Sequence, residues 1–242
     1  MDLLKAGAQD LHIPLKIEHL EAYQRYYDIL VEWNEKFNLT AITDYDAAQV
    51  RHFLDSLSCL LALEPTERLA GRRVIDVGTG AGFPGIPLKI YQPAMQLTLL
   101  EATAKKTDFL QHLVAQLGLE GVTVLHGRAE DLGQDLRHRE RYDWAIARAV
   151  AEMAILAEYL LPLTRIGGRV LAQKGESAAA EVQRAEWSIN RLGGHVRRLI
   201  PVELRGLAET RHLVVLDKVA ATPGKYPRRP GMPSKRPLMP ED

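Results

Sequence analysis

A glycine-rich stretch at residues 74–85, VIDVGTGAGFPG, contains the residue types most able to hold a nucleotide-like ligand. Glycines let a ligand come close to the backbone, and a helix that follows such a loop offers unpaired N–H groups. Two motifs overlap here, the dinucleotide fingerprint G-x-G-x-x-G and the pattern D-x-G-x-G-x-G. Their residues are Asp76, Gly78, Gly80, Gly82 and Gly85. The glycines alone therefore do not select the ligand.

The charge of Asp76 favours one ligand over the other. A dinucleotide would place a pyrophosphate beside the loop, and an adjacent carboxylate would repel it. S-adenosylmethionine carries no phosphate and presents an ammonium, a sulfonium and a carboxylate, so Asp76 suits its cationic end, directly or through water. The alternative is that Asp76 only accepts hydrogen bonds from N–H groups of the loop. The charge argument still favours the methyl donor over NAD.

Two further acidic positions follow strand-like runs. Glu101 ends LTLLEAT, about 20 residues past the glycines, where an acid can accept hydrogen bonds from ribose hydroxyls. Ala129 and Glu130 in HGRAEDL follow the next run, where an alanine could pack on an adenine face and an acid could bind its amino group. Taken alone, RAEDL is more typical of a helix N-terminus. Three motifs at successive strand ends together predict a nucleoside site.

Cationic residues end the next two runs. Arg148 in AIARAV would leave its strand toward the same crevice, with a surface salt bridge as the alternative. The fifth run, in RIGGRVLAQKG, follows a Gly-Gly turn and ends at Lys174. Such a turn before the fifth strand is common in S-adenosylmethionine-dependent methyltransferases. Both cations are therefore candidates for the site.

Residues for nucleophilic or acid–base catalysis are not evident. Cytosine-C5 transfer needs a thiolate, but Cys59, the single cysteine, lies in the apolar DSLSCLLAL and is predicted to be a core residue. Exocyclic-amine methylation commonly uses an Asn/Asp-Pro-Pro-aromatic tetrapeptide where this chain has ARAV, and its eight histidines lack metal-ligand spacing. Guanine N7 has a free lone pair and no proton to lose, so its methylation needs alignment rather than a base. No catalytic nucleophile, base or metal is therefore predicted.

The elements that would position these residues alternate from about residue 71 to 220. Strand-like runs at RRVIDV, QLTLL, VTVLH, YDWAIA and GRVLAQK are separated by helical patterns. This alternation predicts βαβ units on a mostly parallel sheet, with the ligand at the carboxyl ends of the strands. Two later runs, HVRRLIPV and RHLVVLDKV, are predicted to form an antiparallel hairpin at the sheet edge.

Two flanking regions differ from this α/β domain. Residues 1–70 are predicted to be a helical extension, with a second helix at about 46–63. The residues of its first apolar helix face are Ile17, Leu20, Tyr23, Tyr27, Leu30 and Val31. Residues 221–242 carry six prolines and are predicted to be either disordered or an extended strap.

Composition and charge narrow the class of protein. The chain has 242 residues, no net charge and no apolar run long enough for a membrane span, and its N-terminus lacks the pattern of a signal peptide. We therefore expect a cytoplasmic protein without disulfides, and a monomer. The segment from Lys218 to Pro240 contains no acid and six basic residues, Lys218, Lys225, Arg228, Arg229, Lys235 and Arg236.

Several of these motifs resemble one family. NLTAI, RHFLDSL, VIDVGTGAGFPGIPL, RAED, ARAV, LAQKGE, RHLVVLDK and YPRRPGMPSKRPL occur in the expected order from about residue 38 to 238. Together they resemble the bacterial small-subunit ribosomal RNA guanine-N7 methyltransferases, also called the glucose-inhibited division protein B family. The resemblance implies a Rossmann-like class I S-adenosylmethionine-dependent methyltransferase fold with an N-terminal helical extension. It also implies S-adenosylmethionine as donor, S-adenosylhomocysteine as product, and a guanine of 16S rRNA in the small ribosomal subunit as acceptor.

The resemblance also assigns residues. It carries the donor contacts onto Gly78, Phe83, Ala129, Glu130 and Arg148, beside Asp76, Gly80, Gly82 and Glu101 from the motif argument. Many members have leucine at the place of Phe83 and aspartate at the place of Glu101. We expect Phe83 to alter the wall around the adenosine and Glu101 to reach the ribose with slightly changed geometry, each in the same role. Candidates for contact with the base or the RNA are Asn38, His52, Asp55, Lys174, Arg211, Arg228, Arg229, Lys235 and Arg236. An N-cap, a buried structural hydrogen bond or a solvated tail explains several of these equally well.

Three other functions stay open at this point. A small-molecule methyltransferase on the same fold would have no use for the basic tail. An NAD-dependent reductase is allowed by the G-x-G-x-x-G match. A non-catalytic RNA-binding module would keep the fold without the donor. The rRNA N7 methyltransferase is the interpretation that accounts for most of the motifs.

Overall fold

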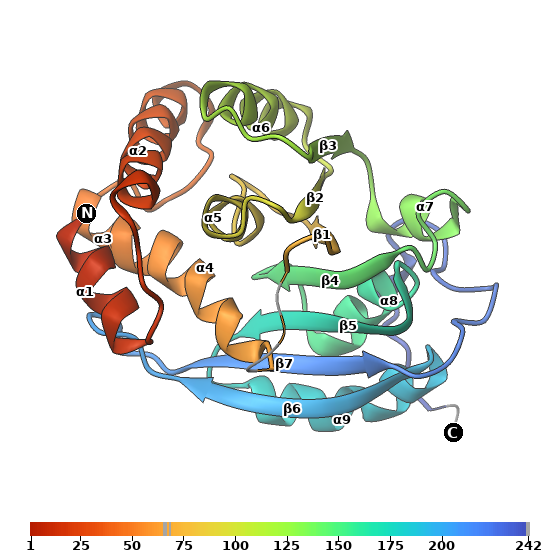
Figure 1. Cartoon of the computed structure of the whole chain (residues 1–242). Coiled ribbons are helices and arrows are strands. Elements are labelled where there is room, and N and C mark those ends of the chain that lie inside the picture. Colours follow the sequence, from red (N-terminus) through yellow and green to blue (C-terminus); the bar gives the residue numbers. More distant parts are fainter. Residues whose placement is uncertain (65–66, 68, 241–242) are drawn as a thin grey trace.

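The computed structural model describes residues 1–64, 67 and 69–240. Within them, seven strands form one sheet in the order β3-β2-β1-β4-β5-β7-β6 (Figure 1). The strands are β1 Arg73–Val77, β2 Gln96–Glu101, β3 Val122–His126, β4 Tyr142–Arg148, β5 Thr164–Lys174, β6 Gly194–Val202 and β7 Arg211–Lys218. The first five are parallel, and β7 runs antiparallel to both β5 and β6. The predicted parallel sheet and its antiparallel edge hairpin are confirmed.

Helices cover both faces of this sheet (Figure 1). On one face lie α1 Asp2–Asp10, α2 Ile17–Phe37, α3 Tyr45–Ala48, α4 Asp55–Leu57, α5 Gly85–Tyr91 and α6 Ala104–Gln116. On the other face lie α7 Ala129–Gln134, α8 Met153–Leu160 and α9 Ala178–Arg191, with α10 Met232–Lys235 near the chain end. No helix in the described ranges is long and apolar enough to cross a membrane.

Strand periodicity explains where the polar residues of the site point. Side chains alternate between the two faces of a strand. In β4, Trp144 and Ile146 pack in the core beneath the N-terminal helices, whereas Ala145 and Ala147 pack beneath α8 and α9. Arg148 continues the first series and therefore faces the helical extension.

The helical extension packs directly on the α/β domain. Tyr23 and Tyr26 of α2 are fully buried, and their hydroxyls donate to Pro87 O at 2.9 Å and Ala81 O at 2.5 Å. The predicted apolar face is correct for Tyr23 but wrong for Ile17, which is 71% exposed. Ile17 is the first residue of α2, where no neighbouring turn covers it. The expected helix at 46–63 exists as four short segments: α3, a π-helical turn at Gln49–Leu54, α4 and a 3-10 turn at Ser58–Ala62.

The basic end of the chain is a strap folded against α7 and α8. Arg139 donates to Thr222 O and Tyr226 O, both at 2.7 Å, and Leu238 is buried in the core of that face. Of the two alternatives from the sequence, the structure has the strap for residues 221–240, although Met232–Lys235 within it forms the short helix α10 rather than extended chain. Residues 241–242 lie outside the described part.

Candidate functional site

A cavity of about 250 Å³ lies at the carboxyl ends of β1, β2 and β3, and we call it the strand-end cavity. The order of the sheet changes direction at β1, and open α/β sheets bind ligands at such a point. Its lining comes from the three predicted motifs, from the loop after β4, from α8 and from the strap. The lining residues are Val77, Gly78, Leu100, Ala102, Gly127, Arg128, Ala129, Glu130, Val150, Ala151, Tyr159 and Ser234.

The glycine loop presents backbone at this cavity. Gly78 and Gly80 have φ values of +69° and +62°, a left-handed conformation that glycine adopts at little cost. A Cβ on Gly78 would lie 2.8 Å from Cγ2 of Val150, whereas a Cβ on Gly80 would meet no atom within 4 Å. Gly82 differs, because its Cβ would lie 2.6 Å from the Tyr26 hydroxyl. Gly82 therefore serves the packing of α2, and Gly78 serves the cavity wall.

Asp76 is fully buried beneath the loop. Its Oδ2 accepts hydrogen bonds from Thr79 Oγ1 at 2.6 Å and from Gly85 N at 2.8 Å. Its Oδ1 is buried without a hydrogen-bond partner among the described residues. Burial raises the pKa of this carboxyl to about 6, although the two hydrogen bonds act to lower it. Asp76 thus fastens the loop through one oxygen and keeps the other unpaired.

Glu101 also holds the loop. Its Oε2 accepts from Gly80 N at 3.0 Å, and its Oε1 accepts from Thr103 N at 2.9 Å. The side chain is nearly buried at the end of β2. Glu101 ends β2 as expected, but it is not among the residues that line the strand-end cavity, so its contact with a ribose stays a prediction.

Glu130 connects the strand-end cavity to the strap. It lies in the first turn of α7 with Ala129, both are buried, and its Oε1 accepts from Gly231 N at 2.9 Å. Nearby, the hydroxyls of Tyr159 and Ser234 are 2.9 Å apart. The strap therefore forms one wall of the cavity. The sequence motifs did not indicate this role for the strap.

One predicted RNA contact has a different partner in the structure. The guanidinium of Arg228 binds the fully buried carboxylate of Glu158 through three hydrogen bonds of 2.7 to 3.2 Å. The side chain of Arg228 therefore anchors the strap, and its contact with RNA stays a prediction. Arg229, Lys235 and Arg236 are exposed on the same segment.

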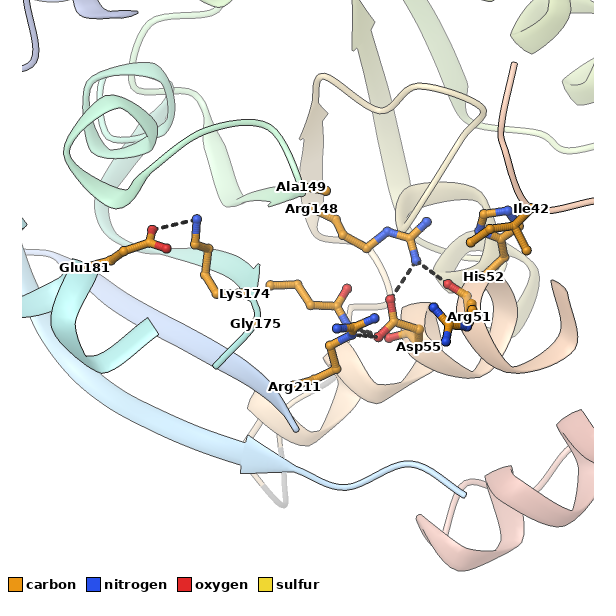
Figure 2. A pocket seen from close by; sticks show the side chains of 11 residues that line it. Ile42, Arg51, His52, Asp55, Arg148, Ala149, Lys174, Gly175, Glu181 and Arg211 are labelled. Carbon is orange, nitrogen blue, oxygen red and sulfur yellow. Dashed lines mark hydrogen bonds and ion pairs between the residues drawn. The ribbon is translucent and has the colours of Figure 1, made fainter. Parts of the chain in front are cut away.

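A second cavity, of about 370 Å³, lies at the ends of β4, β5 and β7, and we call it the cation pocket (Figure 2). Ala149 lines it, and the next two residues line the strand-end cavity, so the loop after β4 separates the two. Its lining residues are Ile42, Arg51, His52, Asp55, Arg148, Ala149, Gln173, Lys174, Gly175, Glu181 and Arg211. Five candidates from the sequence, His52, Asp55, Arg148, Lys174 and Arg211, meet here.

Asp55 is the centre of this pocket. Its carboxylate is buried and accepts from Arg148 at 2.8 Å, from Arg211 at 3.2 Å and from Gln173 at 2.9 Å (Figure 2). Arg148 also donates to Arg51 O at 3.1 Å. These contacts join α4 to β4, β5 and β7, so one carboxylate fixes the geometry of three strand ends.

Lys174 enters the pocket from the opposite face of the sheet. Its Nζ binds Glu181 of α9 at 2.7 Å and Ala151 O at 2.8 Å. The contact with Ala151 ties the end of β5 to the loop that separates the two cavities. Burial raises the pKa of Glu181, but hydrogen bonds from Lys174 and Ser177 outweigh burial and hold it below its usual range.

Phe83 lies in a stack of rings between the loop and the extension. Its ring centroid is 5.1 Å from that of Tyr26 and 4.4 Å from that of His52, with near-parallel planes. The Arg148 guanidinium carbon lies 5.0 Å from the Phe83 centroid. Burial, with Arg148 nearby, lowers the pKa of His52 to about 4, so its imidazole is neutral at pH 7. Its Nε2 contacts Thr40 Oγ1 at 3.1 Å.

Two further sequence expectations have structural answers. Asn38 is exposed and forms the left-handed C-cap of α2, with φ +49°. Cys59 is buried, and burial raises its pKa far above the usual range. Cys59 is therefore a core residue, as predicted. Among the described residues, no group of three or more His, Cys, Asp or Glu could hold a metal ion.

Sequence reasoning missed several lining residues. Glu181 and Tyr159 lie within helices, and Arg51 lies in the π-helical turn, so none is at a strand end. Gln173 and Arg51 stand next to the candidates Lys174 and His52. Their places beside these candidates in the motifs LAQKGE and RHFLDSL could have identified Gln173 and Arg51 as lining residues.

Solved structures share the fold at low sequence identity. The chain resembles a 16S rRNA (adenine(1408)-N(1))-methyltransferase from Catenulisporales acidiphilia, with a TM-score of 0.51, 14% identity, and 64% of this chain and 88% of that chain covered. It also resembles TYW2 of M. jannaschii in complex with AdoMet, with a TM-score of 0.52, 14% identity and coverage of 72% and 81%. These likenesses confirm the class I methyltransferase fold.

Relatives at higher identity establish the family. Ribosomal RNA small subunit methyltransferase G of Roseiflexus castenholzii is 51% identical over 239 residues, 99% of this chain and 100% of the relative. The protein of that name from Alkaliphilus metalliredigens is 47% identical over 236 residues, 98% of each chain. The family model for GidB, rRNA small subunit methyltransferase G, matches residues 19–214. The chain therefore belongs to the GidB family of rRNA small subunit methyltransferases.

Proposed function

We propose that this protein transfers the methyl group of S-adenosylmethionine to N7 of a guanine in 16S rRNA of the bacterial small ribosomal subunit. The observation that carries the proposal is the pairing of two cavities on either side of the loop after β4. One is lined by glycine backbone and the other by cations, as a nucleoside donor and an RNA acceptor require. Membership of an rRNA methyltransferase family supports the same pairing.

The strand-end cavity fits the adenosine part of the donor. Ala129 offers an apolar surface and Glu130 a carboxylate on the same turn of α7. Gly78 lets the ligand reach the backbone, and the buried Asp76 supplies negative charge beneath the loop. When bound, S-adenosylmethionine supplies an electrophilic methyl group on a positively charged sulfur. We assign its methionine end to the neighbourhood of Asp76, Phe83 and Arg148.

The chain's own residues act by position in this reaction. The N7 lone pair forms the bond to the methyl carbon, the carbon–sulfur bond breaks, and S-adenosylhomocysteine leaves. N7 loses no proton, so no general base is required. Aligned reactants at close range supply most of the acceleration. The low pKa of His52 and the raised pKa of Cys59 leave neither suited to acid–base or nucleophilic work.

The organisation of the chain follows from this assignment. The helical extension at 1–70 and the strap at 221–242 flank the methyltransferase domain at 71–220, and each contributes a wall to one cavity. We assign exposed cations of the strap, Arg229, Lys235 and Arg236, to RNA contact, because basic side chains neutralise phosphates. The protein acts in the cytoplasm as a monomer.

The test is to mix the protein with labelled S-adenosylmethionine and small ribosomal subunits that lack the modification, and then to map the labelled base. We expect one guanine of 16S rRNA to carry the label at N7. Label on an exocyclic amine, on a ribose or on no RNA would contradict the proposal.

Gly80→Asp provides the matched control. Aspartate tolerates the left-handed conformation of this position better than most residues, and a Cβ there meets no atom within 4 Å. The variant should therefore fold while its carboxylate enters the loop beside Glu101. We expect no labelled RNA from this variant.

A further inference from the structure

The cation pocket contains more positive than negative charge. Arg51, Arg148, Lys174 and Arg211 line it together with the carboxylates of Asp55 and Glu181 (Figure 2). His52 adds no charge at pH 7, because its pKa lies at about 4. Two positive charges are therefore left in excess within one cavity of about 370 Å³.

Each oxygen of the two carboxylates in the pocket accepts at least one hydrogen bond within the protein. Asp55 Oδ1 accepts from Gln173 and Arg211, and Asp55 Oδ2 accepts from Arg148. Glu181 Oε1 accepts from Ser177 at 2.7 Å, and Glu181 Oε2 binds Lys174. With Met153 N as a further donor to Glu181 Oε2, each acid accepts three hydrogen bonds within the protein, which occupies most of its acceptor capacity.

Donors, in contrast, remain available. Asp55 engages only Nε of Arg211, so both terminal nitrogens of that guanidinium are without a partner in the part of the chain that the structure describes. The same holds for the side chain of Arg51, which is exposed at the rim. Lys174 uses two of its three N–H groups within the protein. The pocket therefore suits a ligand that accepts hydrogen bonds and carries negative charge.

The residues that carry these available N–H groups lie apart from the cavity assigned to the methyl donor. Arg211 and Lys174 lie on β7 and β5, and Arg51 lies in the helical extension. These strands are on the opposite side of β4 from β1, β2 and β3, whose ends form the strand-end cavity. An anion held by Arg211, Lys174 and Arg51 is therefore part of the methyl acceptor and not of the methyl donor.

We propose that the cation pocket binds a backbone phosphate of the rRNA beside the target guanine, with Arg211, Lys174 and Arg51 as its ligands. The proposal rests on the assignment of rRNA as substrate. Arginine is suited to this role because its planar fork can bind two phosphate oxygens at once. Asp55 acts as a positioning residue, since it holds Arg211 by Nε and leaves the terminal nitrogens directed at the ligand.

The experiment measures equilibrium binding of the protein to unmodified 16S rRNA over a range of KCl concentrations. Each lost phosphate contact lowers the slope of log affinity against log salt by about 1. We expect Arg211→Ala and Arg51→Ala each to lower the slope by about 1 and to weaken binding at least about tenfold. Arg51 is exposed, so its loss leaves the fold intact even where Arg211→Ala destabilises the protein. Calorimetry on the same variants should give wild-type affinity for S-adenosylmethionine.

Arg137→Ala is the matched control. Arg137 binds Asp135 at 2.6 Å, an ion pair of the same kind as that between Arg211 and Asp55. It precedes β4, whereas the pocket lies at the end of β4, so the length of the strand, ~20 Å, separates the two. This variant should keep the wild-type slope and RNA affinity.

Three outcomes would overturn the proposal. The first is a wild-type slope in both Arg211→Ala and Arg51→Ala. The second is weaker S-adenosylmethionine binding with an unchanged slope, which would assign the pocket to the carboxylate of the methyl donor. The third is a wild type that does not bind the rRNA. Methyl transfer is measured separately. If the wild type binds RNA and the variants show the predicted slopes, but N7 is not methylated, the proposed reaction is wrong and the phosphate site stands.

Discussion

The strand-end cavity and the cation pocket lie side by side but are built in different ways. The first is formed mainly by segments that directly follow consecutive parallel strands, β1, β2 and β3. The second joins residues far apart in the chain, such as Asp55 with Arg148 and Arg211, which are 93 and 156 positions away. A ligand site made from neighbouring strand ends is a property of the fold class, whereas the cation pocket depends on the helical extension and the edge hairpin. The difference explains how a common fold can acquire a particular acceptor.

The largest effect should come from Asp55→Ala. This change leaves the largely buried Arg148 and the partly buried Arg211 without their carboxylate. Removal of one member of a buried ion pair costs about 3–5 kcal/mol, and we expect that loss in the free energy of unfolding measured with denaturant. Asp135→Ala, which breaks the exposed pair with Arg137, should leave the unfolding midpoint unchanged. If the Asp55→Ala variant is as stable as the wild type, Asp55 does not hold the residues of the pocket together.

Glu130→Ala tests the strand-end cavity alone. The variant loses the carboxylate assigned to adenine and the hydrogen bond to Gly231 N. We expect the affinity for S-adenosylmethionine to fall at least about tenfold, or about 1.4 kcal/mol. The salt slope of RNA binding should not change, because Glu130 lines only the strand-end cavity of the two. Wild-type affinity of this variant in calorimetry would show that Glu130 is not part of the donor site. We expect a loss of the same size for Arg148→Ala, and wild-type affinity there would likewise exclude Arg148.

Arg228→Ala distinguishes an anchor of the strap from an RNA contact. Without the Arg228 side chain, the strap loses three of its four hydrogen bonds to Glu158, and Ser234 is held less firmly at the cavity. We expect donor affinity to fall by about fivefold, roughly 1 kcal/mol, with the salt slope of RNA binding unchanged. The exposed neighbour Arg229 provides the control, since Arg229→Ala should lower that slope and keep donor affinity. The reverse pattern would identify Arg228 as an RNA contact.

The smallest effect concerns the pH dependence of donor binding. The pKa of Asp76 in the free protein is raised to about 6 by burial, and a bound cationic donor would lower it. Affinity is therefore highest above pH 6 and falls as Asp76 becomes protonated, by about twofold between about pH 8 and about pH 6. Calorimetry should show this trend in the wild type, a flat profile in Asp76→Asn, and a weaker trend for S-adenosylhomocysteine, which lacks the sulfonium charge. A wild-type profile as flat as that of Asp76→Asn would contradict this role.

The same contrast explains what the sequence could predict. Periodicity and turn residues located the five parallel strands and the edge hairpin, and parallel strand ends necessarily converge, so Gly78, Ala129 and Glu130 could be assigned to one cavity. Charge type alone located Arg148 and Lys174, but not their partners. Ile17 was misplaced because spacing does not show which end of a helix is covered.

The strap shows the limit most clearly. Its prolines and cations predicted an extended segment with RNA contacts; the strap is present and packed on the domain, but Met232–Lys235 is a short helix. The partner of Arg228 is Glu158, a buried acid within the otherwise apolar α8, and no local pattern links the two. Pairings that depend on tertiary packing cannot be obtained from spacing along the chain.

A crystal structure of the protein with S-adenosylmethionine tests the division between the two cavities most directly. The account predicts adenine against Ala129 and Glu130, with the sulfonium near Gly78 and with Arg211 and Lys174 free of the ligand. An empty strand-end cavity, or a donor carboxylate bound between Arg211 and Lys174, would contradict it.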